Sequence, residues 1–97
     1  MRLLPNETVL IGKWELISGQ MQGDQTEERI ELLVSGLLEK VSSASGGWEI
    51  LYRDPRDGRY WELTFPRSEM HGSGPRALRY IEQSEAQNKY TISALGR

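Results

Sequence analysis

The stretch LYRDPRDGRYWELTFPRSEMHGSGP, Leu51–Pro75, is the most informative part of the sequence because it joins a tight hairpin to a glycine-rich loop. Asp54–Gly58 has the composition of a turn, in which proline fixes φ early and glycine accepts a positive φ late. The turn predicts a hairpin of two strands, Trp48–Arg53 and Arg59–Phe65. The loop that follows, Pro66–Pro75, contains the single histidine of the chain.

Side chains alternate between the two faces of such a hairpin. Large apolar residues fall on one face and are expected to meet a helix; they are Trp48, Ile50, Tyr52, Trp61, Leu63 and Phe65. The opposite face is mixed and is expected to contact water; it holds Glu49, Leu51, Arg53, Tyr60, Glu62 and Thr64.

A helix is predicted upstream of the hairpin, from Asp24 to Val41. Asp24 is a good N-cap, and Glu27 stands three residues on, as a capping box requires. Apolar residues then recur at three- and four-residue steps and form one stripe: Ile30, Leu33, Val34, Leu37, Leu38 and Val41. Ser42–Gly47 is expected to end the helix as a flexible loop.

The remaining elements are short. Thr8–Ile17 reads as an extended segment, with a turn at Ser18-Gly19 and a return strand at Gln20–Gln22. Arg76–Ile81 is predicted as an edge strand, and Ser84 is expected to cap a final helix that ends near Tyr90. The sequence therefore predicts one α+β domain over residues 1–97, a small antiparallel sheet packed against one main amphipathic helix, plus a short C-terminal helix.

Composition excludes several classes of protein. The 97 residues suffice for one modest core and contain no cysteine, which excludes disulfides, a thiolate nucleophile and cysteine-based metal sites. A reducing cytoplasm is the expected compartment. Net charge is −3 over residues 1–47 and +1 over residues 48–97, so neither half has the basic excess of a nucleic-acid-binding surface. The N-terminal residues fit neither a signal peptide nor a spanning helix, so no membrane contact is expected.

The candidate chemistry is sparse. His71 with Glu69 could perform acid–base work, but a surface histidine is the favoured interpretation. Gly72–Gly74 precedes a proline and a strand, whereas a phosphate loop leads into a helix. No metal-ligand spacing is present, and no cofactor is expected. Arginines and aspartates around the hairpin turn form either solvated ion pairs or an interface patch.

The whole stretch Leu51–Pro75, together with LPNETVLIGKW (Leu4–Trp14) and RIELL (Arg29–Leu33), resembles the immunity protein 27 family. The likeness runs from about Leu4 to Tyr90. It implies a bacterial protein of a polymorphic toxin system that is not an enzyme. Such a protein binds a cognate toxin domain and neutralises it by stoichiometric masking, in the cytoplasm of the producing cell or its kin.

An inhibitor of this kind needs a rigid, complementary surface, and arginine and aromatic residues commonly anchor such surfaces. We therefore expect partner-binding residues on the hairpin and the loop after it: Arg53, Asp57, Arg59, Tyr60, Glu62, Glu69 and His71. The back of the predicted helix is the second candidate surface, with Glu28, Leu32, Ser35 and Glu39. Two other functions stay open: a small hydrolase-type enzyme using His71 and Glu69, and a generic protein-interaction adaptor.

Overall fold

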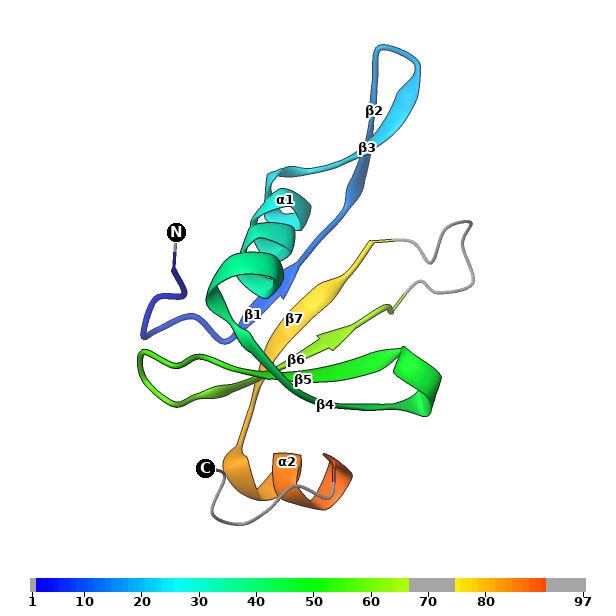
Figure 1. The fold of residues 1–97 in the computed structure, drawn as a ribbon. Helices are drawn as coiled ribbons and strands as arrows, with labels where there is room; N and C mark the ends of the chain where they lie inside the picture. The colour runs from blue at the N-terminus through cyan, green and yellow to red at the C-terminus, as the bar shows by residue number, and fades with distance from the viewer. Residues whose placement is uncertain (1, 67–74, 91–97) are drawn as a thin grey trace.

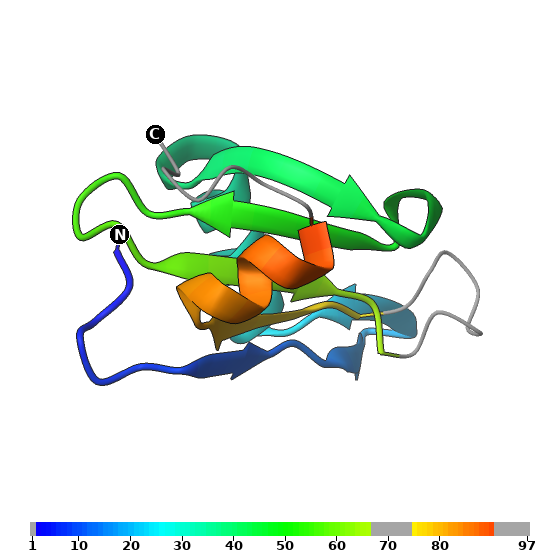
Figure 2. The ribbon, with the colours of Figure 1, turned by 90° about the horizontal axis from the view of Figure 1, so that it is seen from below.

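The structure is a computed structural model, and it describes residues 2–66 and 75–90 (Figure 1). Five strands form an antiparallel sheet in the order β1-β7-β6-β5-β4, and β2 and β3 form a separate two-stranded hairpin. The helices α1 and α2 cover opposite faces of the larger sheet (Figures 1 and 2). The predicted α+β class is confirmed. The element bounds are β1 Val9–Ile11, β2 Trp14–Ile17, β3 Gln20–Gly23, α1 Gln25–Leu32, β4 Glu39–Ala44, β5 Glu49–Arg53, β6 Tyr60–Thr64, β7 Ala77–Ile81 and α2 Gln83–Tyr90.

The turn between β5 and β6 forms as its composition predicts. The Asp54 amide donates to the Arg59 carbonyl at 2.9 Å, and the Gly58 amide donates to the Asp54 carbonyl at 2.7 Å. Gly58 has φ of 80°, a conformation that glycine adopts without strain. The turn sets a register in which Tyr52 lies opposite Trp61.

The first core lies between the sheet and α1. Ile30 and Leu33 are fully buried there and pack on Trp61 and other residues of the predicted apolar face. The prediction that this face meets a helix is therefore confirmed for Ile50, Tyr52, Trp61, Leu63 and Phe65. It is wrong for Trp48, which is 49% exposed. Burial of large apolar side chains of this kind is the main stabilising contribution in a domain of this size.

The second core corrects the sequence prediction for the opposite face of the hairpin. Leu51, Tyr60 and Glu62 are buried there, not exposed to water. The short helix α2 covers this face and contributes Ala86 and Tyr90 to a cluster with Leu51 and Tyr60. Sequence alternation identified the two faces, but it could not show that the final helix folds back onto the second one.

The main helix is shorter than predicted. The α-helix ends at Leu32 and continues only as a π-helical turn, Leu33–Leu37, closed by a 2.8 Å bond from the Leu38 amide to the Leu33 carbonyl. Leu38 is extended, and the chain enters β4, which pairs with β5. The first half of the predicted loop, Ser42–Ala44, is thus strand, because pairing with β5 supplies partners for its backbone groups. The second half, Ser45–Gly47, forms a 3-10 turn.

β7 is also not the edge strand that the sequence suggested, because β1 pairs with its outer side, Leu10 opposite Leu78. The extended segment predicted over Thr8–Ile17 divides at Gly12: β1 joins the sheet, and β2 leaves it to form the hairpin with β3. A Cβ atom at Gly12 would lie 2.9 Å from the Arg76 carbonyl oxygen, so only glycine fits this crossing.

Candidate functional site

The hairpin places five of the seven predicted partner-binding residues in very different surroundings. Tyr60 and Glu62 are buried beneath α2. Arg53 and Arg59 are half-buried, and Asp57 is exposed on the turn. Glu69 and His71 lie outside the described residues, so their predicted roles remain predictions.

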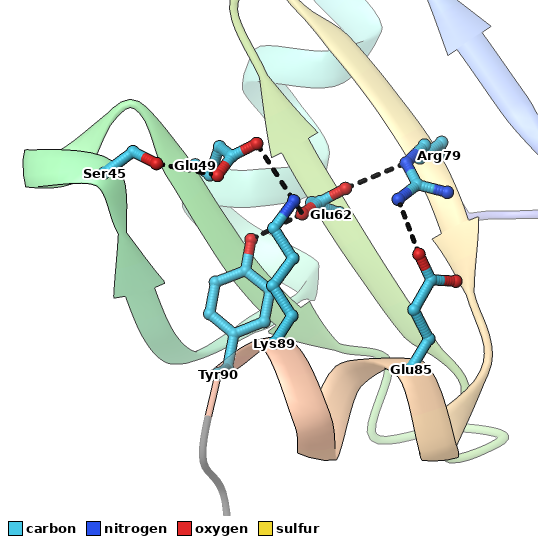
Figure 3. A network of polar contacts seen from close by, with 7 residues as sticks. All are labelled: Ser45, Glu49, Glu62, Arg79, Glu85, Lys89 and Tyr90. Carbon is cyan, nitrogen blue, oxygen red and sulfur yellow. Dashed lines mark hydrogen bonds and ion pairs between the residues drawn. The ribbon is translucent and has the colours of Figure 1, made fainter.

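Glu62 is the centre of a polar network between the sheet and α2, shown in Figure 3. Its side chain is only 1% exposed, although it ends in a carboxylate that can carry a negative charge. Lys89 Nζ lies 2.6 Å from Oε2, and the Tyr90 hydroxyl donates to the same oxygen at 2.7 Å. Arg79 Nε donates to Oε1 at 2.8 Å. The consecutive elements β7 and α2, which follow Glu62 by 17 to 28 residues in the sequence, supply these three partners.

The outer members of the network connect it to the surface. Lys89 also contacts Glu49 at 2.9 Å, and Arg79 also donates to Glu85 at 3.2 Å (Figure 3). Each cation therefore bridges the buried carboxylate and a more exposed one. This sharing balances the charge of Glu62, which uncompensated burial would make strongly unfavourable.

The network also fixes protonation states. Burial raises the pKa of Glu62, but hydrogen bonds from Lys89 and Tyr90 and the charge of Arg79 outweigh it and hold this pKa below its usual range. Burial and the hydrogen bond to Glu62 raise the pKa of Tyr90. The carboxylate is therefore ionised and the phenol protonated at neutral pH, which makes the pair a lasting structural contact.

Arg59 connects the hairpin turn to the N-terminal segment. Its amide and its Nε donate to Asp57 at 3.0 and 2.8 Å. Its terminal nitrogens donate to the carbonyl oxygens of Leu4 and Glu7, and its guanidinium lies 5.0 Å from the ring centre of Trp61. Arg53, by contrast, makes a long ion pair with Glu39 at 3.8 Å.

Sequence reasoning missed two ion pairs that fasten α1. Arg29 donates to both carboxylate oxygens of Glu7 at 2.6 Å, and its hydrogen bonds lower the pKa of Glu7 to about 2. Glu27 accepts from the amide of Arg76 at 3.0 Å and from its Nε at 2.6 Å. The predicted capping box is therefore half correct: Asp24 caps the Glu27 amide at 2.8 Å, but the Glu27 carboxylate binds Arg76 instead.

The exposed part of the second candidate surface lies along α1. The predicted Ser35 is exposed on the π-helical turn that follows α1. The predicted Glu28 and Leu32 are exposed on α1 beside Glu31, and Leu32 keeps 55% of its surface. With Gln22 of β3 they line a hollow of about 480 Å³. Glu39 does not share this face, because it belongs to β4.

A third surface carries exposed apolar side chains on β1 and the β2–β3 hairpin: Val9, Ile11, Leu16 and Met21, each at least 50% exposed. Ile17 is 43% exposed but lies on the other side of the hairpin, beside Glu15 and Gln22. Val9 and Ile11 lie in the stretch LPNETVLIGKW that carries the family resemblance, but nothing in the sequence marked these side chains as exposed. The polar residues of the hairpin turn and of α2 thus serve to fasten elements together, whereas apolar and acidic residues remain on the surface near β2 and β3. Such a surface suits contact with another protein.

Within residues 2–66 and 75–90, no group of three or more histidine, cysteine or carboxylate side chains could hold a metal ion. None of the helices in the same part of the chain has the length and apolar character needed to cross a membrane.

Comparison with known proteins gives one result. The family model described as Immunity protein 27 matches residues 16–82, more than half of the chain. Searches of curated proteins and of solved structures found no match.

Proposed function

The chain belongs to the immunity protein 27 family, and we propose that it neutralises one cognate toxin of a bacterial polymorphic toxin system by binding that toxin in a stoichiometric complex. The family match is the observation that carries this proposal. Membership of the family implies an immunity protein that binds a toxin and is not an enzyme; the cognate pairing, the masking and a cytoplasmic location are the proposed steps beyond it.

The construction of the chain supports inhibition by masking. An inhibitor that covers a toxin needs a stiff surface of fixed shape, because ordering a loose surface on binding would cost affinity. The ion pairs Glu62–Lys89, Glu7–Arg29 and Glu27–Arg76 each join elements that are distant in the sequence. They hold α2, the N-terminal segment and α1 in place before any partner arrives.

The burial pattern narrows the proposed contact residues on the hairpin. Asp57, Arg53 and Arg59 keep exposed atoms and remain proposed contacts. Tyr60 and Glu62 are buried, so we propose that they support binding indirectly by holding α2. The acidic face of α1 around Glu28 and Leu32 is a further proposed contact, for which a basic surface on the toxin would be complementary.

Co-expression with the toxin tests the proposal. The probe is the toxin domain encoded beside the gene for this chain, expressed from an inducible promoter. We expect the toxin alone to stop growth, the pair to grow normally, and the purified complex to have the mass of one copy of each chain by light scattering. A chain carrying Leu63→Asp, which places a charge in the first core, is the control that should not protect. Unrelieved toxicity with a well-folded, abundant chain would contradict the proposal.

A further inference from the structure

The two edges of the larger sheet differ in how they are protected against pairing. The register of β4 shifts between Lys40 and Ser42, which leaves a bulge at Val41, and Glu39 and Lys40 place charges on that edge. Bulges and charges of this kind prevent another strand from adding to a sheet. β1 pairs regularly across Val9–Ile11 and contains no charge, proline or bulge. Figure 2 shows β1 at the outer edge of the sheet.

The backbone of β1 has hydrogen-bonding groups that point away from the sheet. The Tyr80 amide donates to the Thr8 carbonyl at 2.7 Å, and the Gly12 amide donates to the Arg76 carbonyl at 2.8 Å. Because bonding alternates along an antiparallel pair, Leu10 also bonds to β7, while Val9 and Ile11 direct their amides and carbonyls outward. In the part of the chain that the structure describes, β7 is the only strand beside β1.

The side chains of β1 that are exposed at this edge are apolar, and two cations lie near them: Arg79 opposite Val9, and Lys13 at the hollow beside Ile11. Val9 and Ile11 are 50% and 56% exposed. Ile11 also lines a hollow of about 400 Å³ together with Trp14 of β2 and Met21 of β3. Leu16, which lies opposite Met21 in the hairpin, is 70% exposed and extends the apolar surface outward.

We propose that an extended strand of the toxin adds to the sheet at β1. Its backbone would bond to Val9 and Ile11, and its apolar side chains would cover these residues and enter the hollow beside Trp14. Only an extended backbone satisfies the outward donors and acceptors of an edge strand, and pockets for alternate side chains select the sequence. This inference rests on the proposed function, and it names the surface and the kind of toxin segment involved.

A second copy of this chain fits the same edge less well. Two-fold pairing of β1 with itself would join only Val9 and Ile11 of each copy, along roughly 10 Å of strand. It would also send the two β2–β3 hairpins to opposite ends, away from each other. A stable interface buries about 1,200 Å² or more. A toxin strand can reach that area because it can continue from β1 along the apolar side of the hairpin.

Hydrogen exchange tests the proposal without altering the chain. The amides of Val9 and Ile11 are measured by NMR in the free protein and in its complex with the toxin domain encoded beside its gene. We expect exchange of both amides to slow by at least about tenfold in the complex, whereas the Leu10 amide is protected in both states. Unchanged exchange at Val9 and Ile11 would overturn the proposal and leave the proposed function standing.

A pair of substitutions at Val9 distinguishes the contribution of its backbone amide to toxin binding from that of its side chain. Val9→Pro removes an outward donor and leaves the bonds to β7 intact, while Val9→Thr keeps the donor and the branched shape. We expect Val9→Pro to weaken toxin binding at least about tenfold and Val9→Thr to weaken it less than about threefold, with both folded by circular dichroism. Equal affinity of the two variants would overturn the pairing.

Two further experimental outcomes, loss of toxin binding and self-association of the chain, would lead to different conclusions. Failure of the unaltered chain to bind the toxin domain at all would overturn the proposed function and this inference with it. Protection of Val9 and Ile11 that rises with protein concentration in the absence of toxin would assign the edge to a second copy and overturn the proposal of a toxin strand.

Discussion

The hydroxyl of Tyr90 lies 2.7 Å from Oε2 of Glu62, so the last residue of α2 is tied to a carboxylate in the middle of the sheet. The same oxygen is 2.6 Å from Lys89 Nζ. One helical turn therefore supplies both a neutral donor and a cation to a carboxylate that is 1% exposed. α2 is attached to the sheet by polar contacts as well as by apolar packing. Substitutions that remove only the polar contacts can therefore test them while leaving the packing intact.

Glu62→Ala should destabilise the protein by about 3 kcal/mol, because removing one member of a buried charge network leaves its partners uncompensated. Glu49→Gln is the matched control: it removes a carboxylate that is 29% exposed from the same lysine, and should cost less than about 1 kcal/mol. Urea unfolding at neutral pH measures both. Similar losses for the two variants would show that Glu62 is not the centre of the network.

Tyr90→Phe keeps the buried ring and removes only the hydroxyl. We expect a loss of about 1.5 kcal/mol in the free energy of unfolding, the usual contribution of a hydrogen bond to a charged group. The loss should be concentrated at α2, so amide exchange across Gln83–Tyr90 should accelerate more than exchange in α1. Uniform acceleration over both helices would contradict the local role of this contact.

Acid should weaken the attachment of the N-terminal segment. The pKa of Glu7 is about 2 in the folded protein, against an ordinary value of 4.5, because Arg29 bonds to the ionised form. A folded pKa below the unfolded one contributes stability above about pH 4.5 that is lost as the pH falls toward 2.

Glu7→Gln isolates this contribution. The variant should be about 1 kcal/mol less stable near neutral pH, because the half-buried pair is well oriented but partly screened by solvent. Its free energy of unfolding should also fall less steeply with acid than that of the unaltered chain. Urea titrations at several pH values provide the comparison, and parallel curves for the two proteins would refute the assignment.

Gly12→Ala should destabilise the protein by about 2 kcal/mol or more, because the new methyl group would crowd the Arg76 carbonyl and the Glu27 side chain. Gly36→Ala is the control, since a Cβ at Gly36 meets nothing within 4 Å. It should be neutral or raise stability by up to about 1 kcal/mol, as alanine favours helical backbone. Thermal unfolding distinguishes the two, and equal effects would contradict the close crossing at Gly12.

The features predicted correctly from the sequence are those set by neighbouring residues. Asp24 caps α1, and Gly58 completes the β5–β6 turn, because each depends on groups within a few positions. The end of the main helix was not predicted, since Leu38 and Val41 continue the apolar stripe beyond it. Pairing of β4 with β5 outweighed that local pattern, as tertiary contacts commonly do.

In the candidate site, too, the features that depend on residues distant in the sequence were not predicted. Glu62 alternates with apolar residues along its strand, which is typical of a side chain in water. Its burial depends on Arg79 and Tyr90, which lie 17 and 28 residues further along the chain. The position of β1 at the edge of the sheet was likewise not predicted from the sequence, because whether a strand is central or at an edge depends on the order of the whole sheet.

The pairing of β1 with β7 joins two neighbouring strands of the sheet that are synthesised at very different times. β1 emerges early from the ribosome, but it has no strand to dock on until Ala77–Ile81 has followed. Contacts between such distant segments form slowly. A newly made chain can therefore offer the complete edge to a toxin only after almost all of residues 9–81 has left the ribosome, so protection should lag behind translation.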